Sequence, residues 1–157
     1  MVLAAFLFMR KMIRTSNVNI LTDQLEDNGN TPDNDLVSNY TIPKAIEVFE
    51  ITGPLFFGAA YKFKDAIRFV KKTPQVFIIR MRQVPIIDAT GIKTLEEVYK
   101  DIKHRGAKLI LAEVHSQQVM QEIKDSRLLF AIGKANVTQT LEGALQRANI
   151  ILSEKVD

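Results

Sequence analysis

One apolar run that ends near a proline constrains the fold of this chain most strongly. Residues 76–79, Val-Phe-Ile-Ile, are continuously apolar, which is typical of a central strand covered on both faces of a parallel sheet. Pro85 cannot donate a hydrogen bond to a neighbouring strand, so regular pairing should end there. We therefore predict a strand with Arg80 and Arg82 pointing outward at its end, followed by a loop over residues 84–91.

A helical period replaces the strand pattern after this loop. From Ile92 onward, apolar residues recur at helical spacing with charged residues between them, which predicts an amphipathic helix beginning close to Gly91. Asp88 and Thr90 carry oxygens that can accept hydrogen bonds from its first backbone N–H groups. Two roles stay open, helix capping or contact with an external anion or partner. The candidate contact residues are Asp88, Ala89, Thr90 and Gly91.

Strand-like and helix-like stretches alternate through the rest of the chain. Strands are predicted at residues 45–51, 76–79 and 108–112. Helices are predicted after residues 55–59, near Gly91, after Ser116 and from Asn136, where Gln139 completes a capping-box pattern. Residues 128–131 are predicted to be a short edge strand or a buried loop. The alternation indicates an α/β domain with an open, mostly parallel sheet and about four helices.

Three loops are expected to share one edge of this sheet. In open parallel sheets, ligands bind outside the carboxyl ends of the strands. Loops 52–58, 84–91 and 113–117 would meet at that edge. Phe56 and Phe57 lie in the first of them and are further candidate contact residues, with core packing as the alternative role.

The side chains that several kinds of chemistry need are missing or scattered. The sequence has no cysteine and 2 histidines, which excludes disulfides, thiol nucleophiles and a histidine-based metal cluster. It contains no phosphate-binding loop, dinucleotide fingerprint or nucleophilic-serine motif. The net charge is +3, and the basic residues are mixed with acidic ones, which argues against nucleic-acid binding. This favours a non-catalytic binding module without a cofactor over an enzyme.

The N-terminal segment leaves two interpretations open. Residues 1–9 are apolar and basic residues follow them, whereas a signal peptide places its basic residues first. The run is about half of the roughly 20 residues that a membrane-spanning helix needs. Residues 1–21 are therefore either a segment of a soluble protein or the cytoplasmic end of a membrane helix with its juxtamembrane segment. Residues 22–39 are predicted to be an acidic flexible linker, and residues 40–157 the folded domain.

Two motifs in this domain resemble a known family. EVFEITGPLFFGAA, residues 47–60, and IIDATGI, residues 86–92, resemble the STAS domain, which sulfate transporters and anti-sigma factor antagonists share. Residues 53–60 resemble more closely the SulP family of anion permeases, in which STAS is the C-terminal cytoplasmic domain. Residues 1–14 look like the end of the last membrane helix of such a permease.

The resemblance implies a single STAS-type domain that regulates, positions or assembles a sulfate-type anion transporter through protein contacts. Its partner would be the membrane part of the same transporter, at the cytoplasmic face of the membrane. A homodimer formed through the full transporter and weak nucleotide binding are further implications.

A soluble anti-sigma factor antagonist is the alternative within the same resemblance. In that branch, a kinase phosphorylates the hydroxyl that directly follows the loop aspartate, and this sequence has Ala89 there. Thr90 keeps a hydroxyl one residue later and is the phosphorylation candidate.

Overall fold

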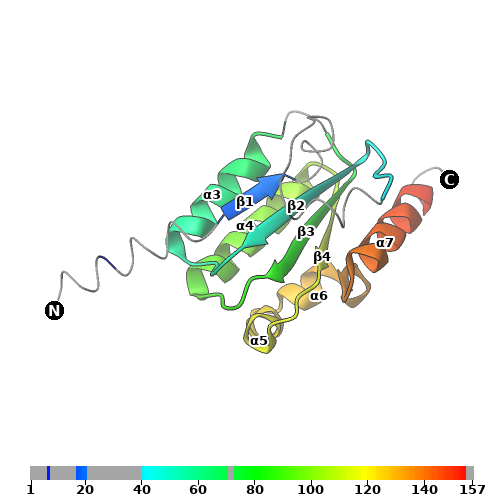
Figure 1. Cartoon of the computed structure of the whole chain (residues 1–157). Helices are drawn as coiled ribbons and strands as arrows, with labels where there is room; N and C mark the ends of the chain where they lie inside the picture. The colour runs from blue at the N-terminus through cyan, green and yellow to red at the C-terminus, as the bar shows by residue number, and fades with distance from the viewer. Residues whose placement is uncertain (1–6, 8–16, 21–39, 71–72, 155–157) are drawn as a thin grey trace.

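The computed structural model describes residue 7 and residues 17–20, 40–70 and 73–154, in which a five-stranded sheet has the order β1-β2-β3-β4-β5 (Figure 1). Strand β1 is antiparallel to β2, and the other neighbouring pairs are parallel. The strands are β1 Asn17–Ile20, β2 Ile46–Thr52, β3 Val76–Gln83, β4 Lys108–Ala112 and β5 Val137–Thr138. The predicted open, mostly parallel sheet is confirmed.

Helices cover both faces of this sheet (Figure 1). Helices α3 and α4 pack on one face, α7 packs on the other, and α5 and α6 lie beside β4. The helices are α3 Phe57–Arg68, α4 Ala89–His104, α5 Gln117–Asp125, α6 Leu128–Ile132 and α7 Leu141–Glu154, and a 3₁₀ turn, η1, spans Lys134–Asn136.

Strand alternation divides the buried apolar residues into two cores. Phe49, Phe77 and Leu111 point toward α3 and α4, whereas Val48 and Ile78 point toward α7. Because successive side chains of a strand point to opposite faces, a continuously apolar strand can serve both cores. This explains why residues 76–79 are apolar without interruption.

Three predictions about the chain after residue 79 were wrong. Residues 128–131 belong to the short helix α6 and are not a strand or loop. The last helix begins at Leu141 and not at Asn136, because Thr140 supplies the cap by accepting a hydrogen bond from the Gly143 N–H at 3.0 Å. Arg80 does not point outward, since its exposed fraction is 2%.

Strand β1 extends the sheet beyond the segment in which the folded domain was expected to begin. Asn17–Ile20 pairs with β2 between Phe49 and Thr52, so four residues of segment 1–21 contribute to the sheet. The rest of that segment, apart from residue 7, and the linker prediction for residues 22–39 lie outside the described residues. Within the described residues, no helix has the length and apolarity needed to cross a membrane.

Candidate functional site

The three loops predicted to share one edge are joined by hydrogen bonds. The Leu55 N–H donates to the Ile86 carbonyl at 3.0 Å, and the Gly53 N–H donates to the Gln83 carbonyl at 2.9 Å. On the other side, the Ser116 hydroxyl donates to the Pro85 carbonyl at 2.7 Å. We call the surface formed by loops 52–58, 84–91 and 113–117 the rim.

Gln118 fixes the middle loop of the rim through hydrogen bonds of both its side-chain amide oxygen and its side-chain amide nitrogen. Its Oε1 accepts from the Ile87 N–H at 3.0 Å, and its Nε2 donates to the Ile87 carbonyl at 2.9 Å. Both backbone groups of Ile87 therefore have partners although the residue lies in a loop. Gln118 has no signal in the sequence for this role, because a glutamine in the first turn of a helix does not indicate a partner 31 residues away.

Asp88 caps α4, as the sequence predicts. Its side chain is half-buried and its backbone is extended. The Oδ1 atom accepts a hydrogen bond from the Gly91 N–H at 2.7 Å, and the backbone carbonyl accepts one from the Ile92 N–H at 3.0 Å. Gly91 is buried, and a Cβ there would lie 2.3 Å from the Leu55 carbonyl oxygen. Gly91 therefore allows the start of α4 to pack closely against the first loop. Of its neighbours, Ala89 is exposed and Thr90 is half-exposed.

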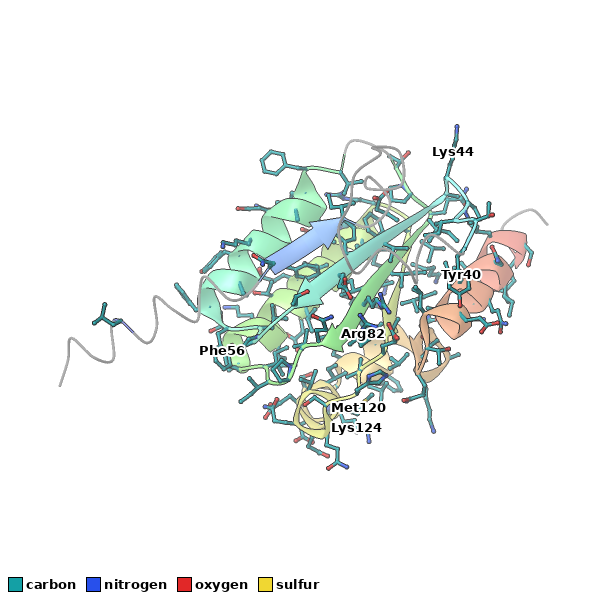
Figure 2. The ribbon with its side chains drawn as sticks, viewed as in Figure 1. Tyr40, Lys44, Phe56, Arg82, Met120 and Lys124 are labelled. Atoms are coloured by element: carbon teal, nitrogen blue, oxygen red, sulfur yellow. The ribbon has the colours of Figure 1, made fainter. Side chains whose placement is uncertain are left out.

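The two phenylalanines of the first loop differ in exposure. Phe56 is half-buried and directly precedes α3, as Figure 2 shows. Phe57 is 63% exposed and stacks edge-to-face with Tyr61 at a ring-centroid distance of 5.1 Å. Core packing therefore does not account for Phe57. With Ile86, which is 40% exposed, it adds apolar surface to the rim.

A largely buried group of charged residues lies toward the carboxyl ends of β2, β3 and β4. The Arg80 Nε donates to a carboxylate oxygen of Glu113, and its guanidinium also lies 3.4 Å from the Glu50 carboxylate. Glu113 has a φ of 57°, a left-handed conformation that is rare for residues other than glycine. Arg82, two residues after Arg80, is half-buried near the end of β3 (Figure 2). Arg80 thus links three strand ends and orients the loop that follows β4.

The described residues offer little for catalysis. No group of three or more histidine, aspartate or glutamate residues among them is placed to hold a metal ion. His104 and His115 contact only backbone carbonyls, of Lys100 and Gln139, in the hydrogen bonds found for their rings. The pKa of the Glu97 carboxyl is lowered, first by a hydrogen bond from Lys64, but this pair joins α3 to α4 and lies away from the rim.

The family model described as the STAS domain matches residues 38–144. The chain belongs to the STAS domain family. A solved sulfate transporter family protein from Wolinella succinogenes is 36% identical, with a TM-score of 0.71 over 77% of this chain and 98% of that chain.

A SulP transporter STAS domain from Vibrio cholerae is 32% identical to the present STAS domain. The match has a TM-score of 0.62 and covers 74% of this chain and 89% of that one. Sulfate transporter 3.2 of Arabidopsis thaliana is 26% identical over 117 residues, which are 67% of this chain. The match spans 18% of the length of that transporter. The STAS domain described here therefore belongs with those of sulfate transporters, as its motifs predict.

Proposed function

We propose that this STAS domain is a non-catalytic regulatory domain of a sulfate-type anion transporter and acts through protein contacts at the rim. It would lie at the cytoplasmic face of the membrane, with the membrane part of the same transporter as its partner. The observation that supports this most is the 36% identity to a sulfate transporter family protein over 98% of that chain. The proposal includes no cofactor.

The rim has the properties of a surface that another protein covers. Ile86 is exposed on the loop before α4, and Ala89 and Phe57 are exposed at the first residues of α4 and α3. Aromatic and apolar side chains on a rigid frame contribute most to protein interfaces. The backbone hydrogen bonds to Ile87 and the Asp88 cap provide that frame. A partner would therefore meet a preorganised surface, which lowers the entropy cost of binding.

The gene structure supplies the first test. The proposal expects a reading frame that continues upstream of residue 1 and encodes many hydrophobic spans. A translation start at Met1, with no such spans in the frame, would contradict the transporter assignment.

Sulfate uptake by the full transporter supplies the second test. Ile86→Asp places a charge on the rim and should weaken its contact with a partner by about tenfold, because one charge buried in an interface costs more than about 1.4 kcal/mol. We therefore expect a lower uptake of radiolabelled sulfate. Ile150→Asp is the matched control, since Ile150 is 48% exposed on α7, away from the rim. Equal uptake by the two variants at equal membrane abundance would refute a role for the rim.

Phosphorylation of Thr90 remains a separate proposal. Its hydroxyl lies in the first turn of α4, where a phosphate would be near the positive end of the helix dipole. Intact-mass analysis of the protein from its native cell tests this, and the absence of added phosphate on Thr90 would refute it.

A further inference from the structure

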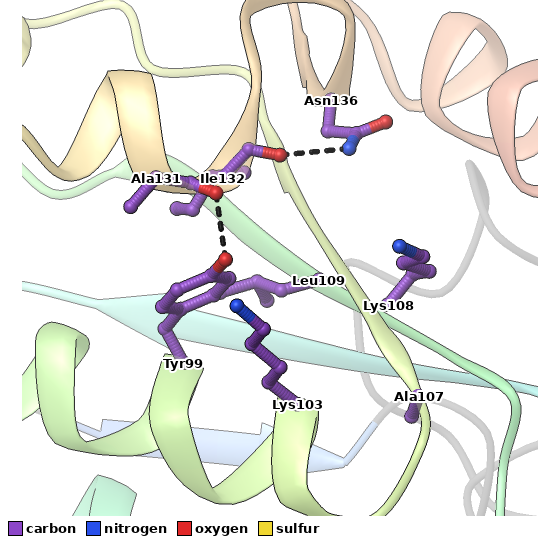
Figure 3. A pocket seen from close by; sticks show the side chains of 8 residues that line it. All are labelled: Tyr99, Lys103, Ala107, Lys108, Leu109, Ala131, Ile132 and Asn136. Atoms are coloured by element: carbon purple, nitrogen blue, oxygen red, sulfur yellow. Dashed lines mark hydrogen bonds between the residues drawn. The ribbon is translucent and has the colours of Figure 1, made fainter.

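A pocket lies near the opposite end of α4 from the rim. Helix α4 has 16 residues and is therefore about 24 Å long. Its second half contributes Tyr99 and Lys103 to a pocket of about 260 Å³, shown in Figure 3. The start of β4, the end of α6 and η1 supply the other walls.

The pocket has a buried apolar floor. Ala107, Leu109 and Ile132 line it, and their exposed fractions are 6%, 2% and 6%. The Tyr99 hydroxyl donates to the Ala131 carbonyl at 2.6 Å, which fixes the phenol ring as one wall. These contacts connect α4 to α6, so the floor and this wall are held in place without a ligand.

Asn136 closes the opposite wall through two hydrogen bonds. Its Nδ2 donates to the Ile132 carbonyl at 2.9 Å, and its Oδ1 accepts from the Arg147 Nε at 2.8 Å. Figure 3 shows the first of these bonds above the space that the pocket encloses. The Arg147 guanidinium is thereby held next to Asn136 and adds positive charge near the pocket.

Two lysines make the pocket electropositive. Lys103 and Lys108 line it, from α4 and β4, and no acidic residue does. Among the residues that the structure describes, neither ammonium group has an ion-pair partner. A lysine in the last turn of a helix is commonly explained by the helix dipole, which accounts for Lys103. It does not account for Lys108, the first residue of β4.

We infer that this pocket binds a small organic dianion, either a phosphomonoester or a short dicarboxylate. Two ammonium groups without a competing carboxylate match a doubly charged group, and the floor at Leu109 and Ile132 would receive a short carbon chain. Its volume of about 260 Å³ lies just below the roughly 300–1,000 Å³ of pockets for drug-sized ligands, which favours a ligand of a few carbons. The inference is independent of the transporter assignment and of the rim.

Titration of the ¹⁵N-labelled 157-residue chain followed by NMR tests the inference. Glycerol 3-phosphate, succinate and inorganic sulfate are compared at matched ionic strength. We expect glycerol 3-phosphate or succinate to cause saturable shifts of the Leu109, Ile132 and Asn136 amides, and the tighter of the two identifies the anionic group. Inorganic sulfate should bind more weakly, since it has no carbon chain to place on the apolar floor.

A double variant and a charge-matched control decide whether the pocket is responsible. Lys103→Met with Lys108→Met should weaken binding at least about tenfold, because both charge-assisted hydrogen bonds are lost. Lys62→Met with Lys93→Met removes the same charge from exposed sites on α3 and α4 and should leave the affinity unchanged. Circular dichroism checks that both variants are folded.

Three results would overturn the inference. The first is the absence of saturable shifts at the pocket with either organic anion. The second is an equal loss of affinity in the two double variants, which would indicate general electrostatic attraction. The third is binding of inorganic sulfate as tight as that of the organic anions, which would refute an organic ligand.

Discussion

Gly91→Ala is the most informative single substitution at the rim, because it has two opposing effects on stability, a gain in helix propensity and a steric clash, and the structure shows which is larger. In an open helix, alanine in place of glycine stabilises by about 1 kcal/mol. At residue 91, an ideal Cβ would lie 2.3 Å from the Leu55 carbonyl oxygen and 2.6 Å from the Ile87 Cγ1, whereas ordinary contact begins at 3.4 Å. The nearer atom is backbone, so it cannot rotate away, and its loop is already hydrogen-bonded to Ile86.

The clash should outweigh the gain in helix propensity. Overpacking of this kind costs about 1–3 kcal/mol, and the upper end applies where backbone must move. We therefore expect Gly91→Ala to lower the free energy of unfolding by about 2 kcal/mol and Tm by about 4–8 °C. Urea unfolding followed by circular dichroism measures the first quantity, and a thermal scan measures the second.

Gly143→Ala in α7 is the control for this experiment. A Cβ there would lie 3.1 Å from the Thr140 Oγ1, which caps α7, and this exposed side chain needs to move by only a few tenths of an ångström while it keeps its bond to the residue 143 N–H, so stability should change by less than about 1 kcal/mol. Gly91→Ala with stability equal to or above that of the unmodified protein would show that α4 and the first loop do not approach as closely as described.

Three further substitutions test other contacts. Arg80→Met should destabilise by about 3–5 kcal/mol in urea unfolding, because it leaves buried carboxylates without their arginine, and a loss below about 1 kcal/mol would contradict the burial of this group. Gln118→Ala removes two hydrogen bonds to Ile87, so we expect a loss of about 1–2 kcal/mol and faster hydrogen exchange of the Ile87 amide; unchanged exchange would argue against the contact. Lys64→Met should raise the pKa of the Glu97 carboxyl toward its ordinary value, because the Lys64 hydrogen bond is the main cause of the lowering. Since the folded-state pKa of Glu97 is lowered, the Lys64–Glu97 pair stabilises the fold at neutral pH, and this contribution to stability is lost as pH falls through that pKa. NMR titration of the Glu97 carboxyl carbon in both proteins measures the change in pKa. Equal pKa values in the two proteins would show that Lys64 is not the cause of the lowering.

Sequence patterns that extend over a few residues predicted the strands and caps that depend on residues close together in the chain. Strand β4 was predicted with its observed bounds, Lys108–Ala112, and the apolar run at residues 76–79 lies within β3. The Asp88 cap and the helix after Ser116 were predicted, because a cap joins residues three apart in sequence. Prediction failed at Asn136, which ends η1 and does not cap a helix, because its side chain bonds Ile132 and Arg147.

The sequence by itself determined the alternation of strands and helices, the loop that begins α4, and the family motifs, because periodicity and capping act over a few residues. Only the tertiary structure decided four features: the burial of Arg80, the two hydrogen bonds between Gln118 and Ile87, the antiparallel strand β1 at the sheet edge, and the pocket beside Lys108. Each of these joins residues that are about 30 apart or that lie on separate elements, as Arg80 and Glu113 do. The spacing of apolar residues along the chain does not predict such contacts, because they depend on which strands become neighbours when both apolar cores are buried.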